Sequence, residues 1–239
     1  MATSPFLTAE WRQLAMLNYE VDPPSLRELV PRGCELDLWR GRAYVSVVGF
    51  LFLDTRVRGL AIPFHRNFEE VNLRFYVRRQ GPEGWRRGVV FVKEIVPRTA
   101  IALVARALYN ERYVALPMRH RSLAAGVGAV AYEWRLGARW NRISLAPATD
   151  PQPLEIGSHA EFIAEHYWGY SVQRDGGTVE YRVEHPPWRV AEATAARLDA
   201  DVASLYGERF VGPLAAAPAS AFLAEGSGVS VYPGIRLPD

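Results

Sequence analysis

The stretch "NFEEVNLRFYVRR" (67–79) alternates between polar and apolar side chains with a period of two, which is typical of a β-strand with two different faces. One face of this predicted strand carries Val71, Leu73, Phe75 and Val77. The other carries Glu70, Asn72, Arg74, Tyr76 and Arg78. "QGPEGWRRG" (80–88), rich in Gly and Pro, predicts a hairpin loop, and "GVVFVKEIVPR" (88–98) then predicts the antiparallel return strand.

Two adjacent opposite charges, Lys93 and Glu94, interrupt this apolar return strand. The hairpin places Lys93 across from the region of Leu73 or Arg74, but a register slip of one residue would move it to the other face. In a regular strand Lys93 and Glu94 point to opposite faces, so only one of them faces the interior unless a bulge intervenes.

Further strand patterns dominate the chain. We expect extended segments at 9–21, 34–39, 42–57, 129–147 and 228–237. Arg40-Gly41 and Asp175-Gly176-Gly177 predict tight turns, and Gly137 lies near the turn of the 129–147 strand pair.

Helical patterns are few and short. We expect helices at 22–33, at 99–113 and at 157–172, where Ser158 and Glu161 form a capping box. The alanine-rich stretch 190–207 favours a helix on propensity alone. The sequence therefore predicts an α+β, mainly β protein with a single domain over 1–239: a barrel or strongly curved antiparallel sheet with helices outside.

Composition limits the classes of function. The net charge of the 239 residues is +2 with scattered basic residues, which argues against nucleic acid as a partner. No apolar run approaches the length of a membrane span, and the N-terminus lacks the pattern of a signal peptide. The one cysteine, Cys34, cannot form an intrachain disulfide, so we expect a cytoplasmic protein in which Cys34 fills space in the core.

Common cofactor and catalytic motifs are missing from the sequence. We find no glycine-rich phosphate loop, no Gly-x-Ser-x-Gly elbow and no paired Cys or His spacing for zinc. The sequence therefore predicts no cofactor and no metal site.

Several segments are similar to recurring segments of a known family. They are "SLRELVPRGCELDLWRGRAYVSVVGF" (25–50), "EVNLRFYV" (70–77), "GVVFVKEIVPR" (88–98), "VEHPPW" (183–188) and "GVSVYPG" (228–234). Together they resemble the bacterial domain of unknown function 2071, within the acetoacetate-decarboxylase-like superfamily. The resemblance implies a cone-shaped, curved β-barrel around an apolar cavity. It also implies that 188–199 is a strand and that the helix is confined to about 200–206.

The chemistry of the decarboxylase does not carry over in register. The family motif Gly-Arg-Glu…Tyr-Pro-Lys-Lys matches "ARALYNERYVALPM" (105–118), with Arg106 at the motif's arginine. The lysine pair that forms the Schiff base would fall at Ala115 and Leu116, and the acidic partner near Arg56 or Val57. The resemblance therefore implies that this chain is not a standard acetoacetate decarboxylase.

Lys93 is the only lysine among 28 basic residues, and with Glu94 it is the candidate for catalysis. Burial and a neighbouring cation such as Arg74 would lower the pKa of a Schiff-base lysine. The alternatives are an ion pair with Glu70 or Glu94, or a stem that packs while the amine reaches water.

The candidate ligand-binding residues are Glu70, Asn72 and Arg74, with His65 at the rim. If their strand face lines a cavity, they offer a carboxylate, an amide and a guanidinium to one ligand, and Arg74 could hold an organic acid. If the face is wet, they form an ordinary solvated surface. His65 is either an acid–base group or a structural surface histidine.

Aromatic residues gather at two other places. "EHYWGY" (165–170) is interpreted as a helix-to-strand junction or, alternatively, as a pocket wall. His185 and Trp188 in "EHPPW" are interpreted as packing and hydrogen-bond anchors.

The leading hypothesis is a barrel that binds a small, partly apolar organic acid or carbonyl metabolite. If it turns this ligand over, the chemistry is lyase-like or acid–base. The alternatives are a non-catalytic binding or sensing barrel and a structural protein with a filled barrel. Exposed strand edges also suggest a homo-oligomer.

Overall fold

The computed structural model describes residues 4–99, 112–122 and 129–238. The helix expected at 99–113 lies outside the described residues except for Thr99, which is helical, Arg112, and Tyr113, which begins a strand. Strands dominate the described part, and the helices are short, in agreement with the predicted mainly β class.

One large sheet contains the strands. Its curved central part consists of β1 (Leu7–Val21), β3 (Ala43–Val57), β5 (Phe68–Gly81), β6 (Gly84–Val96), β12 (Trp168–Val172), β13 (Thr178–Glu184) and β15 (Ser220–Val231). A wing continues from β15 through β14 (Arg189–Asp199), β10 (Arg139–Pro147), β9 (Val130–Leu136) and β8 (Met118–Arg121). Short strands are β2 (Glu35–Leu36), β4 (Leu60–Ala61), β7 (Tyr113–Ala115), β11 (Gln152–Pro153) and β16 (Ile235–Arg236).

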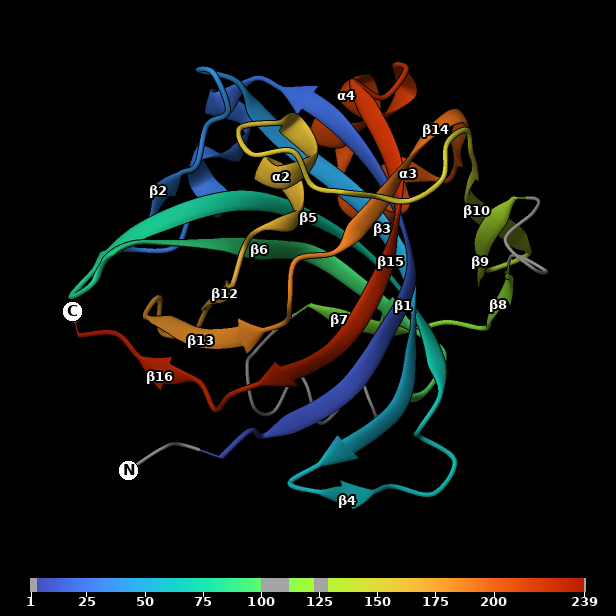
Figure 1. Cartoon of the computed structure of the whole chain (residues 1–239). Helices are drawn as coiled ribbons and strands as arrows, with labels where there is room; N and C mark the ends of the chain where they lie inside the picture. The colour runs from blue at the N-terminus through green and yellow to red at the C-terminus, as the bar shows by residue number, and fades with distance from the viewer. Residues whose placement is uncertain (1–3, 100–111, 123–128, 239) are drawn as a thin grey trace.

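The central part of the sheet curls back on itself. Neighbours pair in the order β13-β12-β6-β5-β3-β1-β15, and β15 pairs with β13 again through Val183–Val231 and Glu184–Ser230. Register shifts in β1, between Thr8 and Glu10 and between Arg12 and Ala15, mark bulges that bend the strand. The long curved arrows of β1, β3 and β15 show this bend (Figure 1).

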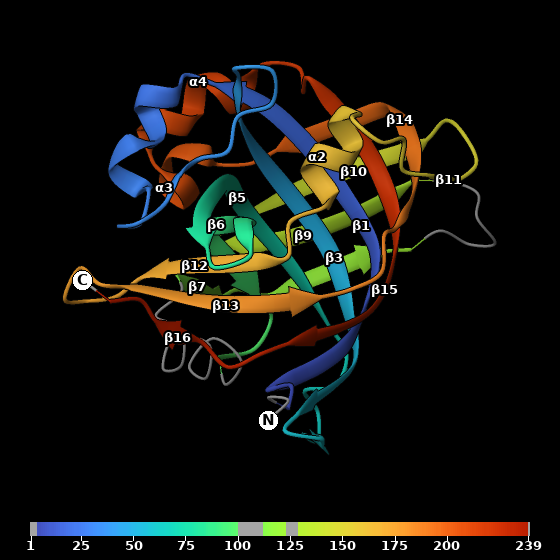
Figure 2. The same cartoon turned by 60° about the vertical axis from the view of Figure 1, so that its left-hand side comes forward.

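The helical segments gather mainly at one end of the curved sheet (Figure 2). They are η1 (Pro23–Leu29), α3 (Val202–Tyr206), η2 (Glu208–Phe210) and α4 (Val211–Ala215), while α2 (His159–Ala164) lies over the sheet. Arg209 connects two of them, because its guanidinium donates to the carbonyl of Ser25 and the carboxylate of Glu28, both at 3.1 Å.

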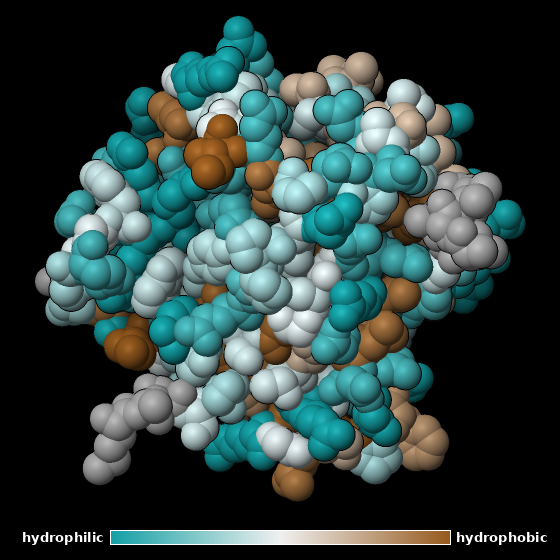
Figure 3. Space-filling view, in the orientation of Figure 1, coloured by the Kyte–Doolittle hydropathy of each residue, from teal (hydrophilic) through white to brown (hydrophobic). Residues whose placement is uncertain are grey.

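The two faces of the β5–β6 hairpin belong to different clusters of buried side chains. Leu73 and Phe75 pack in the larger cluster, with Trp134 and Leu205. Tyr76, on the alternate face, packs in the second cluster. The period-two alternation of the sequence thus corresponds to two buried faces. Figure 3 shows that hydrophilic residues prevail on the outer face drawn there, with scattered hydrophobic ones.

Two local predictions were wrong in extent. The helix expected at 157–172 ends at Ala164, and Trp168–Val172 becomes β12 because it pairs with β13 and with Gly88 and Val89 of β6. The expected loop 80–88 is a tight turn, since β6 already begins at Gly84. The sheet is also not wholly antiparallel, because β6 pairs in parallel with β12 and β7.

Other local predictions are confirmed. Ser158 caps α2 by accepting from the Glu161 amide at 3.1 Å, and 190–199 is a strand despite its alanines, since β10 and β15 flank it. Cys34 is half-buried against the larger cluster, and burial raises the pKa of its thiol to about 12.

Gly226 is the position where curvature depends most directly on a missing side chain. Its φ is +79°, and a Cβ there would lie 2.0 Å from the carbonyl oxygen of Trp11. We expect G226A to lower the free energy of unfolding by about 2–3 kcal/mol in urea titrations, because neither backbone can yield cheaply. The matched control is G212A in α4, where a Cβ meets nothing within 4 Å. Equal stability of the two variants would contradict this account.

Candidate functional site

A cavity of about 230 Å³ lies inside the curved sheet. Most of its wall is aromatic or aliphatic, including Trp11, Phe50, Phe52, Phe68, Trp168 and Trp188. A cavity with such a wall excludes water from most of its surface and accommodates the apolar part of a ligand.

The polar stripe of β5 faces this cavity. Glu70, Asn72 and Arg74 all line it, and their exposed fractions are 3%, 1% and 8%. They share one face because they are spaced by two along the strand. The sequence left open whether this face is wet or internal, and the structure places it inside.

A bulge in β6 decides which of the two adjacent charges joins the stripe. Arg74 pairs with Phe91, but Leu73 pairs with Lys93 and Asn72 with Glu94, so Val92 is the extra residue. Cross-strand partners share a face, and Glu94 therefore lines the cavity beside Asn72. Lys93 lies on the other face with Leu73, half-buried, and is not among the residues that line the cavity.

Glu70 is held in a hydrogen-bonded position on the cavity wall. Asn72 Nδ2 donates to its Oε1 at 3.0 Å, and the Tyr113 hydroxyl donates to its Oε2 at 3.3 Å. Burial raises the pKa of Glu70 to about 7, although these hydrogen bonds and the charge of Arg74 act in the opposite direction. A carboxyl group with this pKa can both release and take up a proton near neutral pH.

The raised pKa of Glu70 implies that the free energy of unfolding depends on pH. The folded state holds the proton more tightly than the unfolded chain, so ionisation costs stability as pH rises from 4.5 to about 7. E70Q cannot ionise, and we expect its stability relative to the unsubstituted protein to grow by roughly 3 kcal/mol between pH 4.5 and pH 8. Urea titrations at several pH values measure this difference. A difference that is the same at both pH values would refute the assignment.

Arg74 is a buried cation whose charge is not fully compensated. Its Nη2 donates to the carbonyl of Ile163 at 3.4 Å, and its guanidinium carbon lies 5.7 Å from the ring centroid of Tyr76. Within the described part of the chain, the Nε of Arg74 has no hydrogen-bond partner, and the Arg74 guanidinium forms no ion pair. A buried guanidinium in this state is suited to an anionic ligand.

His166 is a cavity residue that the sequence did not single out as a ligand-binding group. Its Nε2 lies 3.2 Å from Oδ2 of Asp37, which also accepts from Arg87 Nε at 2.7 Å. Burial lowers the pKa of His166 to about 4, so the ring is neutral at pH 7. The pocket-wall interpretation of 165–170 was the available signal, because His166 and Trp168 both line the cavity.

His65, His185 and Trp188 also line the cavity. His65 is half-buried, and its Nδ1 lies 2.8 Å from the carbonyl oxygen of Pro63. The His185 ring stacks on Trp188 with centroids 4.1 Å apart, and burial lowers its pKa. These contacts agree with the anchoring roles expected from "EHPPW" and place His65 at a point where it can meet a ligand.

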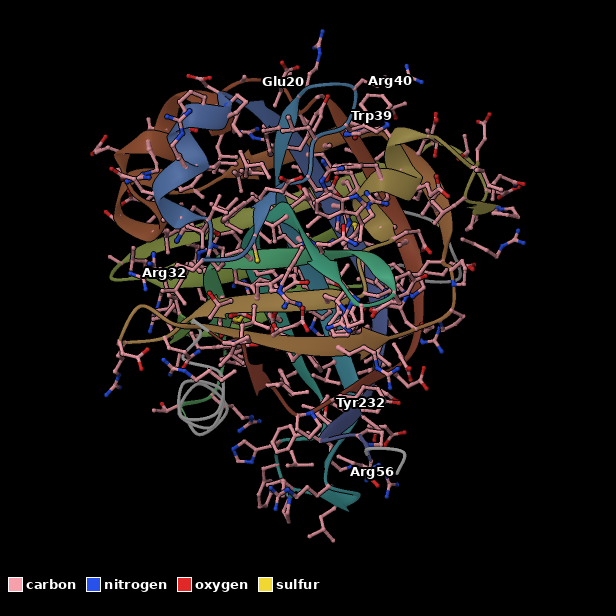
Figure 4. The ribbon with its side chains drawn as sticks, turned by 90° about the vertical axis from the view of Figure 1, so that its left-hand side faces the viewer. Glu20, Arg32, Trp39, Arg40, Arg56 and Tyr232 are labelled. Carbon is pink, nitrogen blue, oxygen red and sulfur yellow. The ribbon has the colours of Figure 1, made fainter. Side chains whose placement is uncertain are left out.

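The positions that match the decarboxylase motif carry no amine. Ala115 ends β7, which pairs with β6 beside the cavity, and Leu116 follows it. Arg56 is exposed near β4, at the opposite end of the molecule from Trp39 and Arg40 (Figure 4). Val57 lines the cavity but is apolar, and Arg106 lies outside the described residues.

The described residues, 4–99, 112–122 and 129–238, contain no cluster of His, Cys, Asp or Glu side chains that could hold a metal ion. None of the helices in this part is long and apolar enough to cross a membrane.

The curved, mainly β sheet has the acetoacetate-decarboxylase-like class of fold, which solved structures of that class share over nearly the whole chain. The chain belongs to the domain of unknown function 2071 family, described as an uncharacterized conserved protein, whose model matches residues 8–228. The Bacillus subtilis (strain 168) uncharacterized protein YqjF is 27% identical over 186 residues, which cover 77% of this chain and 75% of that protein.

Solved structures of low sequence identity share the fold. The enduracididine biosynthesis enzyme MppR, complexed with pyruvate, superposes with a TM-score of 0.68 at 16% identity, over 100% of this chain and 93% of that one. Acetoacetate decarboxylase from Legionella pneumophila gives a TM-score of 0.68 at 13% identity, over 99% and 88%. An acetoacetate decarboxylase-like enzyme from Sphingomonas wittichii RW1 gives 0.66 at 13% identity, over 98% and 94%.

Proposed function

We propose that the cavity binds a small, partly apolar organic acid, with the ligand carboxylate on Arg74. The observation that carries this proposal is the burial of the Arg74 guanidinium in the cavity wall without an ion-pair partner among the described residues. A carboxylate supplies the negative charge and the two acceptor oxygens that a guanidinium fork binds best.

Several buried polar atoms along the cavity wall have no hydrogen-bond partner among the described residues, which supports a ligand with polar groups. They belong to Trp11 (Nε1), Thr55 (Oγ1), Asn72 (Oδ1), Arg74 (Nε) and His166 (Nδ1). Buried polar atoms without partners cost free energy, so a bound ligand or ordered water must satisfy them. The aromatic side chains of the wall take up the apolar part of the acid.

Glu70 and Glu94 supply the acid–base groups if the protein turns over its ligand. Both are buried beside Asn72, and the pKa of Glu70 near 7 suits proton transfer. Lys93 faces away from the cavity, so a Schiff base on its amine is not part of this proposal. A non-catalytic binding protein is the second candidate, and it is favoured by the absence of an amine at Ala115 and Leu116.

Matched acid and amide ligands test the proposal. We expect hexanoate to bind the full chain at least tenfold more tightly than hexanamide in calorimetric titrations at pH 7, since only the acid pairs with Arg74. The two compounds have almost the same size and apolar surface, so the comparison isolates the charge. Equal affinities, or no binding by either compound or by a wider panel of short acids, would overturn the proposal.

A further inference from the structure

His166 lines the cavity and carries a buried ring nitrogen without a hydrogen-bond partner among the described residues. Its side chain is 1% exposed and is held by aromatic neighbours, with ring centroids 4.7 Å from Tyr76 and 5.4 Å from Phe162. The buried nitrogen that lacks a partner in the described part of the chain is Nδ1.

Asp37 determines which ring nitrogen of His166 carries the proton. Hydrogen bonds from His166 and Arg87 outweigh burial and lower the pKa of Asp37, so its carboxylate is ionised and can only accept. The 3.2 Å contact between Asp37 Oδ2 and His166 Nε2 therefore requires a proton on Nε2. Arg87 Nη2 lies 3.5 Å from the same nitrogen, and it donates to the carbonyl of Phe162 at 3.3 Å. The ring is therefore neutral, and Nδ1 carries a lone pair that can accept a hydrogen bond.

The group that meets this lone pair must be a neutral donor. Burial, with smaller contributions from the charges of Arg87 and Arg74, lowers the pKa of His166 and outweighs Asp37, which raises it, so a positive charge on this ring is disfavoured. The same burial and positive charges would disfavour an ammonium group beside Nδ1. A hydroxyl group can donate to Nδ1 without adding charge.

The acceptor lies close to the proposed carboxylate site. Arg74 and His166 both contact the Tyr76 ring, at 5.7 Å and 4.7 Å from its centroid, and Arg74 donates to Ile163, three residues before His166. We infer that the cavity selects acids with a hydroxyl group near the carboxylate, 2- or 3-hydroxy acids, through a hydrogen bond from that hydroxyl to Nδ1 of His166. This inference rests on the proposed function, because it takes Arg74 as the carboxylate site.

The test compares four kinds of six-carbon acid in calorimetric titrations of the full chain. The probes are hexanoate, 2- and 3-hydroxyhexanoate, 2-oxohexanoate and 2-aminohexanoate. We expect the tighter of the two hydroxy acids to bind about fivefold to tenfold more tightly than hexanoate, and more tightly than the oxo and amino acids. In H166F this ratio should fall to about one.

H185F is the matched control, because His185 also lines the cavity but its Nδ1 already lies 3.0 Å from the Pro186 carbonyl. H185F should keep the same ratio between its affinity for the hydroxy acid and its affinity for hexanoate. If acids bind without preference for the hydroxyl, or if the preference survives in H166F, the inference fails and the proposed function stands. If the oxo or amino acid binds more tightly than the hydroxy acids, the inference also fails and the proposed function stands. If none of the acids binds, both the inference and the proposed function are overturned.

A measurement on the unsubstituted protein covers the case in which H166F does not fold. In ¹⁵N NMR spectra the His166 ring should show a proton on Nε2 and an unprotonated Nδ1 at pH 7. Addition of the hydroxy acid should shift the Nδ1 resonance, and hexanoate should shift it less. A proton on Nδ1 would overturn the inference.

Discussion

R74M should reduce the affinity of the protein for hexanoate about a hundredfold in calorimetric titrations at pH 7. Methionine keeps much of the length and apolar volume of the arginine stem but removes the charge and every donor. The loss is large because each hydrogen bond to a buried charge contributes about 1.5–3 kcal/mol, and a guanidinium can make two to one carboxylate.

R74K separates charge from geometry at the same position. It restores the cation without the planar fork, so we expect a loss of about tenfold instead of a hundredfold. R74M should bind hexanamide as the unsubstituted protein does. Its thermal stability should be equal or higher, because removal of a buried, uncompensated charge relieves a cost of folding. A folded R74M that binds hexanoate with unchanged affinity would show that the carboxylate lies elsewhere.

The stripe on β5 could be predicted from sequence, because strict alternation over 67–79 leaves one arrangement of faces. Glu70, Asn72 and Arg74 had to share a face whichever way the strand turned. Which face became the cavity wall was not predictable, since both faces of the strand are buried, one of them against Trp134 and Leu205.

The choice between Lys93 and Glu94 depends on a single extra residue. Without the bulge at Val92, the pairing of Arg74 with Phe91 would continue to Asn72 with Lys93, and the amine would face the cavity. Neither Val92 nor its neighbours carries a glycine or proline signal for a bulge. The chemical character of the site therefore follows from tertiary context that local patterns do not encode.

His166 and its partners come from three distant parts of the chain. Asp37 lies 129 residues before His166, and Arg87 lies 79 before it. No spacing rule connects such residues. The predicted helix 157–172 was at odds with the junction interpretation of 165–170, and the structure supports the junction, because α2 ends at Ala164 and β12 begins at Trp168.

Glu70 and His166, two of the buried titratable groups of the cavity, have opposite effects on the pH dependence of stability. Glu70 has its pKa raised from 4.5 to about 7, so the folded state loses stability as pH rises through that window. His166 has its pKa lowered from 6.5 to about 4, so the folded state loses stability as pH falls through 6.5. Where the windows overlap, the two effects offset each other in the unsubstituted protein. The site thus keeps a protonated carboxyl and a neutral imidazole together near pH 6, and the lowered pKa of His185 acts on stability in the same direction as that of His166.

D37A should lower the free energy of unfolding by about 3 kcal/mol at pH 7, measured by urea titration. The Asp37 carboxylate is 8% exposed and is shared by Arg87 and the buried Nε2 of His166, so its removal leaves both donors without an acceptor. This loss of free energy of unfolding is at the lower end of the range for removing one partner of a buried ion pair, because the Arg87 side chain is 33% exposed and can turn to water. The lowered pKa of Asp37 keeps the carboxylate ionised at neutral pH, so the full effect should be present there.

D199A is the control for D37A. Asp199 pairs with Arg139 at 2.8 Å, but the two side chains are 52% and 54% exposed, and water screens their interaction. We expect D199A to cost only a small fraction of what D37A costs. D37N adds a second contrast, because its amide oxygen can still accept one hydrogen bond although the charge is lost. Its free energy of unfolding should lie between those of D37A and D199A. If D37A were as stable as D199A, the carboxylate would not be holding His166, and the fixed proton on Nε2 would lose its structural basis.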